Sequence, residues 1–367
     1  MTSNPKSVEK DTKPSLYGIK NSNRDFSNPY YWGKNQFNSS FPVSLSCYMR
    51  DKDISSVYLR LSKNRKIFHE EISFNDVFNT NLRNDELYFA FESRFDSFAD
   101  FVHDELKSID LVVKENKSKK PIRPIEIKLT TLPDNTTADL TDENYGTEMV
   151  VRSPTMRYMA LSMAESCQKK FDAIHKIFEP VCARIRDWDN IHEIKNHLPQ
   201  VVEALEEFFE EFRKYERPLL IQPVWKTVGK SPKLAEHCLD IFTWSDFALS
   251  RLFMDSANDS AEEAGDKITR QQRAAIRLAR FLYDVSRNRK VYQQPIYDGM
   301  TYGTLNDKGF SVTGVRMNSY MKCDRLTKPA IRKDEIKRII LGGGQKHLSP
   351  ERRFDAIIYF SRDLFDE

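Results

Sequence analysis

The two runs that decide the fold are SIDLVV at residues 108–113 and PIEIKL at residues 124–129. Both are apolar and rich in β-branched residues, which favours short strands. The stretch between them, residues 114–120, is polar and is followed by Pro121, which is typical of a turn. The sequence therefore predicts a β-hairpin over these residues.

Charged side chains interrupt both predicted strands. If the strands pair symmetrically about residue 118, Asp110 lies opposite Glu126. The two-residue period of a strand places Glu126 and Lys128 on one face, and the other face carries Ile125, Ile127 and Leu129. We therefore expect two carboxylates and an ammonium to converge on one patch.

This patch has the composition of a metal-dependent phosphodiesterase site. A hard cation such as Mg²⁺ binds oxygen ligands and keeps several waters, so Asp110, Glu126 and the backbone carbonyl of Ile127 would suffice to hold it. Lys128 could orient the attacking water and balance the charge that develops on the phosphate. The alternative is a half-exposed hairpin whose outer face merely carries charge, since this spacing often occurs by chance.

Glu92 is a further candidate metal ligand. It lies at the start of a helix that we expect over residues 92–107, where Phe95, Phe98, Val102 and Leu106 recur at helical spacing. A glutamate near a helix N-terminus is also favoured by the helix dipole alone. The sequence leaves both interpretations open.

The amino-acid composition indicates the cellular compartment and argues against some kinds of binding site. The chain has 57 Lys and Arg against 54 Asp and Glu, so any affinity for DNA must come from local segregation of charge. Its five cysteines include no Cys-x-x-Cys pair, which favours free thiols in a reducing compartment and argues against a zinc site. No apolar run is long enough to cross a bilayer. We expect a cytoplasmic protein with no membrane contact.

Two segments are candidates for DNA contact. A predicted helix over residues 267–290 carries arginines at spacings of three, four and three, which could clamp a phosphate backbone or form a solvated stripe, namely Arg270, Arg273, Arg277 and Arg280. Residues 302–325 suggest a glycine-containing hairpin that could enter a groove with Arg316 and Asn318, or an ordinary surface hairpin. In the aromatic and Asn-rich N-terminal segment, the candidates are Arg24, Lys34, Asn35 and Gln36.

Two regions of the chain resemble a known family, the HindVP-type (HindVP/HgiDII-like) Type II restriction endonucleases. The N-terminal part of the resemblance is KPSLYGI at 13–19, NSNRDFS at 21–27 and WGKNQFNSSFP at 32–42. Its second part runs from SID at 108–110 through PIEIKLTTLP at 124–133. The N-terminal part is long and unusual, whereas the second is a general nuclease motif.

The resemblance implies a PD-(D/E)xK nuclease fold and Mg²⁺-dependent double-strand cleavage of a short palindromic DNA site, with a central CG step. Asp110, Glu126 and Lys128 match the catalytic positions of the family, with Ile109 in place of the usual proline, and Glu92 matches its acidic position loosely. A palindromic target implies a homodimer, because each subunit would cut one strand. The resemblance also implies a companion DNA methyltransferase that acts on the same site.

We expect a mixed α/β (α+β) architecture, in which a mixed central sheet is flanked by helices and helical elaborations. One of the expected helices is the aromatic-rich segment over residues 233–254. The expected divisions are a disordered tail over residues 1–14, an arm that contacts DNA or a second subunit over 15–50, the nuclease core over 51–230, and a C-terminal helical and hairpin region with DNA-recognition elements over 231–367. Two other functions compete with a restriction enzyme. One is a repair or Mrr-like nuclease of the same fold that acts on modified or branched DNA, and the other is a non-enzymatic DNA-binding protein.

Overall fold

The computed structural model describes residues 15–26, 36–133, 149–229, 231–259, 267–304, 308–312, 314–341 and 358–364. The predicted tail and two candidate DNA-binding residues, Lys34 and Asn35, lie outside these ranges. Gln36 is the first residue of helix α1 (Gln36–Asp51), which forms the later part of the segment expected to be an arm.

A mixed sheet forms the centre of the molecule, and within the described residues it has nine strands. Its main order is β3 (Ile67–Ile72), β2 (Ser56–Leu61), β10 (Leu234–Ser245), β9 (Pro218–Thr227), β6 (Pro121–Ile127), β5 (Ile109–Glu115) and β4 (Leu87–Ser93). Strands β6 and β9 are parallel, as are β10 and β2, and the other neighbours in this order are antiparallel. Two short strands extend it, because β7 (Thr130–Pro133) pairs with β9 and β12 (Ile331–Arg332) pairs with β10.

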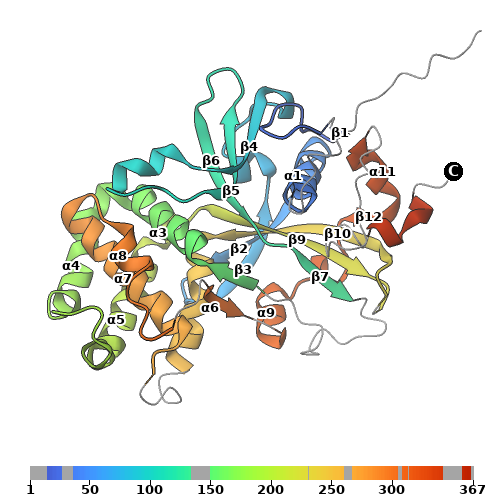
Figure 1. Cartoon of the computed structure of the whole chain (residues 1–367). Helices are drawn as coiled ribbons and strands as arrows, with labels where there is room; N and C mark the ends of the chain where they lie inside the picture. Colours follow the sequence, from blue (N-terminus) through green and yellow to red (C-terminus); the bar gives the residue numbers. More distant parts are fainter. Residues whose placement is uncertain are drawn as a thin grey trace, which may run out of the picture.

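Helices cover both faces of this sheet (Figure 1). One apolar cluster contains side chains of α3 (Ser153–Cys167), α4 (Phe171–Cys182), α5 (Ile191–Phe212), α6 (Asp246–Asp259) and α7 (Arg270–Asn288). The other contains side chains of α1, α2 (Phe74–Phe78) and α11 (Ile336–Ile339). Strand β9 of the sheet lies between the two clusters. Every residue of β9 is therefore buried, as expected for a central strand.

Several shorter strands and helices surround the sheet. They are the pair β1 (Ser15–Leu16) with β13 (Ile340–Leu341), the pair β8 (Met149–Arg152) with β11 (Lys308–Val312), and the helices α8 (Gln293–Tyr297), α9 (Gly314–Met321) and α10 (Asp324–Thr327). Within the described residues, no helix is both long and apolar enough to cross a membrane.

The architecture confirms the expected mixed sheet flanked by helices, but three local predictions are wrong. Residues 92–107 form no α-helix, because β4 continues to Ser93 and a 3₁₀ turn (Asp96–Phe101) follows. Residues 234–245 form strand β10, not the first part of a helix, since an apolar run buried on both faces has no periodicity that separates strand from helix. Residues 314–321 form helix α9 where we expected part of a hairpin.

The predicted division at residue 230 falls between two strands of one sheet. Strand β10 pairs with β9 from Leu234↔Thr227 to Ser245↔Pro218, so the sheet continues across this position. Strand β10 is therefore hydrogen-bonded to β9, and its side chains pack in the same two apolar clusters as those of β9.

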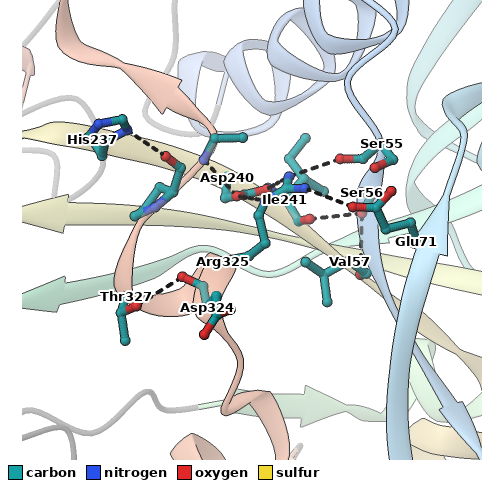
Figure 2. Close-up of polar contacts among 12 residues, drawn as sticks. Ser55, Ser56, Val57, Glu71, His237, Asp240, Ile241, Asp324, Arg325 and Thr327 are labelled. Atoms are coloured by element: carbon teal, nitrogen blue, oxygen red, sulfur yellow. Dashed lines mark hydrogen bonds and ion pairs between the residues drawn. The ribbon is translucent and has the colours of Figure 1, made fainter.

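A buried ion pair attaches the C-terminal segment to the sheet (Figure 2). Asp240 on β10 is fully buried and accepts two hydrogen bonds from Arg325, at 2.6 and 2.7 Å, and one from the Ala330 N–H at 2.8 Å. Arg325 also donates to the Ser55 carbonyl at 2.9 Å. A buried carboxylate is tolerated when its lone pairs are satisfied in this way, and removing Arg325 would leave the buried Asp240 without its cation.

Candidate active site

The β5–β6 hairpin has the predicted register. Leu111 pairs with Ile125 and Val112 with Pro124, so the next position places Asp110 opposite Glu126. The N–H of Ile127 donates to Asp110 Oδ2 at 2.9 Å and ties the two strands together where the pairing ends. The predicted pairing of the two carboxylates is therefore confirmed.

Lys128 joins these carboxylates. Its Nζ donates to Glu126 Oε1 and lies 4.0 Å from Asp110 Oδ2. Its backbone N–H donates to the Ile221 carbonyl of β9 at 3.0 Å, which holds the residue at the end of β6. The three charged groups that the sequence singled out thus meet at one point of the sheet.

Burial shapes the electrostatics of this group. Burial, together with the nearby carboxylate of Glu126, raises the pKa of Asp110 to about 7, while Lys128 and the Ile127 N–H oppose this rise. Burial disfavours the charged form of Lys128, but Glu126 and Asp110 outweigh it and raise the pKa of the ammonium. Two carboxylates that repel one another in a partly dry site form a donor set that fits a hard divalent cation.

Glu92 reaches the same row of charges from the neighbouring strand. The pairs Phe91↔Leu111 and Ser93↔Ile109 place Glu92 at the register position of Asp110. It belongs to β4, so the expectation that it starts a helix, and the helix dipole as its explanation, are wrong. Its φ of 48° lies in the left-handed region, which is costly for a side chain with a Cβ and concentrates at functional sites.

The Glu92 side chain is 64% exposed and belongs to the edge of the site. Among the described residues, no group of three or more His, Cys, Asp or Glu side chains is arranged to hold a metal together. Asp110 and Glu126 contact Lys128, and Glu92 lies at the edge of this group, so ligand roles for all three carboxylates stay predictions.

The N-terminal segment covers the edge of the sheet at β4. The Asn23 side chain donates to the Phe91 carbonyl at 2.8 Å and accepts from the Phe91 N–H at 2.9 Å, so it replaces a missing strand neighbour. Two residues earlier, the Asn21 carbonyl accepts from the Phe89 N–H at 2.9 Å. These bonds place the next residue, Arg24, beside the row of carboxylates.

Arg24 is the only member of the predicted DNA-binding set that the described residues bring to this site. Its side chain is 8% exposed, its guanidinium carbon lies 4.5 Å from the Phe91 ring centroid, and it pairs with Glu92 at 3.6 Å. Burial lowers the pKa of Arg24, and the charges of Glu92 and Asp110 oppose that effect. One cation therefore stands at each end of the carboxylate row, Arg24 at β4 and Lys128 at β6.

Thr155 was not identified from the sequence. It is buried in the first turn of α3, and its Oγ1 donates to Glu126 Oε1 at 2.7 Å. The dipeptide Ser153-Pro154 is a typical helix start and could have signalled the turn. Nothing local in the sequence indicates which carboxylate that turn faces.

The arginines of α7 do not form the predicted exposed clamp. Arg273 is 2% and Arg277 is 6% exposed, because α7 packs among α3, α4, α5 and α6. Arg273 donates to the Thr301 and Thr304 carbonyls, at 3.2 and 3.1 Å, and Arg277 donates to the Gly299 carbonyl at 2.7 Å. The helix is confirmed, but its buried arginines hold residues 299–304 in place.

The remaining candidates are dispersed. Arg280 pairs with Asp284 at 3.5 Å, and Arg270 is partly exposed at the start of α7. On α9, Arg316 is exposed and donates to Ser256 Oγ, whereas Asn318 is buried and is not presented to a groove. Base-reading by Asn318 would therefore require a rearrangement of α9.

Comparison with known proteins shows the family of the chain. The family model of the HindVP restriction endonuclease matches residues 32–365. The chain is similar to the "Type II restriction enzyme HgiDI" of Herpetosiphon aurantiacus, with 40% identity over 98% of this chain and 99% of the relative. It is also similar to the "Probable type II restriction enzyme HindVP" of Haemophilus influenzae, with 41% identity over 96% of this chain and 95% of the relative. No solved structure matches the chain. With the family model spanning nearly the whole sequence, the chain belongs to the HindVP restriction endonuclease family.

Proposed function

We propose that this protein is a Mg²⁺-dependent Type II restriction endonuclease that cuts both strands of DNA at a short palindromic site, with a central CG step. The observation that carries the proposal is the meeting of Asp110, Glu126 and Lys128 at the end of the β5–β6 hairpin, in a chain of this family. Family membership supports site-specific cleavage, and the residues supply its chemistry.

Each residue has a distinct part in this proposal. Asp110 and Glu126, with the backbone carbonyl of Ile127, would hold Mg²⁺, and Glu92 would join them from β4. The bound cation supplies Lewis-acid charge and an acidified water. Lys128, which already contacts both carboxylates, orients the attacking water and balances the negative charge that accumulates on the phosphate oxygens. The Ile127 N–H keeps Asp110 in the geometry that this requires.

DNA contacts are proposed from two cations with exposed surface, Arg270 and Arg316, and from Arg24, whose side chain is largely buried at the margin of the site. Arg24 stands at the site, Arg270 lies at the start of α7, and Arg316 lies on α9. Lys34, Asn35 and Gln36 remain candidates in the N-terminal segment. Because a palindrome has two-fold symmetry, the proposed assembly is a homodimer in which each subunit cuts one strand. A companion DNA methyltransferase would protect the same site in a cytoplasmic restriction-modification system.

Digestion of plasmid DNA tests the proposal. Purified protein should give discrete fragments with Mg²⁺ and none with EDTA, and run-off sequencing of the fragments should return one palindromic site. Asp110→Asn should give no fragments, whereas Glu115→Gln, at the other end of β5, should cut like the wild type.

Three other outcomes would contradict it. Cleavage confined to methylated or branched DNA would indicate a repair or Mrr-like nuclease. Specific DNA binding without cleavage under any divalent metal would indicate a non-enzymatic DNA-binding protein. Cleavage by Asp110→Asn at the wild-type rate would show that the active site lies elsewhere.

A further inference from the structure

The buried hydroxyl of Thr155 contacts the proposed metal site without being a metal ligand. It donates to Glu126 Oε1, the oxygen that Lys128 also contacts. We propose that Thr155 is a positioning residue for the cation, because its hydroxyl holds Glu126 so that the second carboxylate oxygen, Oε2, is presented to the metal. This inference rests on the proposed function of Asp110 and Glu126 as metal ligands.

The position of the hydroxyl is set by the whole of helix α3. One turn after Thr155, the Tyr158 hydroxyl donates to the Lys107 carbonyl at 2.8 Å and accepts from the Phe95 N–H at 3.0 Å. One turn later again, Ser162 Oγ donates to the buried Asp246 carboxylate at 2.6 Å. Polar side chains at spacings of three and four thus fasten one face of α3. A hydroxyl held by such a helix is preorganised and does not depend on a mobile loop.

The attachment of Tyr158 links α3 to the strand that carries Asp110. Lys107 lies two residues before β5, so the bond to its carbonyl fixes the helix relative to the start of that strand. Helix α3 therefore connects the two strands that carry the carboxylates: Thr155 contacts Glu126 of β6, and Tyr158 contacts the segment just before the strand of Asp110. The distance between the two proposed ligands would depend on this connection.

The chemistry of Glu126 explains why a positioning partner matters. The carboxylate is buried, and Lys128 competes for it with a full positive charge. A threonine is restricted at χ1, so its hydroxyl has few alternative directions. Hydrogen bonds from outside the ligand set orient metal-binding carboxylates, and their loss typically costs 10–100-fold in metal affinity.

Binding of Mn²⁺ to the DNA-free protein tests the proposal, with the electron paramagnetic resonance signal of free Mn²⁺ as the readout. Thr155→Val keeps the shape but removes the hydroxyl, and it should weaken the Mn²⁺ dissociation constant by about 10–100-fold. Thr155→Ser restores the donor and should bind within about twofold of the wild type. The Mg²⁺ concentration for half-maximal plasmid cleavage should rise in parallel for Thr155→Val and fall back for Thr155→Ser.

Ser245→Ala is the matched control. It removes an equivalent buried hydroxyl–carboxylate bond, from Ser245 Oγ at the end of β10 to Glu216 Oε2 at 2.7 Å, which does not involve α3, so it should lower the melting temperature without changing Mn²⁺ affinity. If Thr155→Val does not fold, the smaller Thr155→Ala takes its place. Wild-type Mn²⁺ affinity in the valine or alanine variant, or no Mn²⁺ binding by the wild type, would overturn the inference. A wild type that binds Mn²⁺ in a Thr155-dependent way but cuts no DNA would contradict the proposed nuclease function and leave the inference standing.

Discussion

Arg24 of the N-terminal segment pairs with Glu92 of the edge strand, with 3.6 Å between Nη2 and Oε1. This contact brings the segment that carries the most unusual part of the family resemblance to the margin of the carboxylate row. Because Asn21 and Asn23 bond the backbone of β4, the segment acts as an additional partner of the sheet edge. The segment therefore lies next to the candidate active site.

The fastening of this segment by Asn23 gives the first prediction. Asn23→Ala removes both hydrogen bonds to the Phe91 backbone, which should lower the free energy of unfolding by about 1–3 kcal/mol. Plasmid cleavage should fall as well, because Arg24 loses its support. Urea unfolding and a cleavage time course measure the two effects. Exposed Asn81 provides the control, and equal behaviour of Asn23→Ala and Asn81→Ala would contradict the prediction.

Because the pKa of Asp110 is raised, replacing this carboxylate with a neutral amide should stabilise the folded protein at high pH. An Asp that titrates near 7 when folded and near 3.8 when unfolded holds an extra proton in the folded state between these values, so stability falls as pH rises through this range. In metal-free buffer, Asp110→Asn should therefore raise the melting temperature at pH 8, on the order of a few degrees, and change it little at pH 4.

Thermal unfolding at the two pH values checks this sign. Added Mg²⁺ should stabilise the wild type at pH 8 and leave Asp110→Asn unchanged, because the amide cannot replace the carboxylate as a ligand. If Asp110→Asn melts at a lower temperature than the wild type at pH 8, the ionised Asp110 carboxylate does not destabilise the folded protein, and the prediction is contradicted.

Lys128→Arg separates charge from shape in the site. The guanidinium keeps the positive charge, but it is larger and planar and cannot occupy the position of Nζ beside Glu126 and Asp110. We expect cleavage to be lost with the fold retained, as measured by plasmid digestion and circular dichroism. Lys114→Arg on β5 is the matched control, and it should cut normally. Normal cleavage by Lys128→Arg would mean that only its charge matters.

Arg277 should act on stability and leave the electrostatics of DNA binding unchanged. Arg277→Ala leaves the Gly299 carbonyl without its buried donor, so unfolding should become easier by about 1–3 kcal/mol. The dependence of DNA affinity on salt should keep its slope, because a buried arginine neutralises no phosphate. A slope lowered by about one unit, with unchanged stability, would instead support a phosphate contact.

The hairpin could be predicted because its information is local. Strand period and the symmetry of the turn fix the pairing of Asp110 with Glu126, and no distant contact is needed. The α7 arginines show the limit of the same reasoning. Their spacing correctly predicts one helical face, but only the packing of α7 against other helices decides that Arg273 and Arg277 on this face are buried.

The rest of the site depends on contacts between distant segments. Thr155 approaches Glu126 because α3 packs against the sheet, and Arg24 reaches Glu92 because Asn23 docks on β4. The helical spacing of Phe95 and Phe98 predicts a helix that begins at Glu92. In the structure, Phe98 lies in a short 3₁₀ turn and Phe95 precedes that turn. Residue types alone do not encode these contacts.

The most direct test of the central claim compares cleavage and DNA binding by Asp110→Ala. On a duplex that contains the mapped site, the variant should cut at least about 1000-fold more slowly than the wild type, because it loses a ligand of the cation that stabilises the transition state. In mobility-shift titrations it should bind that duplex nearly as tightly as the wild type, since the groove contacts remain. Cleavage at an undiminished rate by a purified Asp110→Ala protein would contradict the account of the active site.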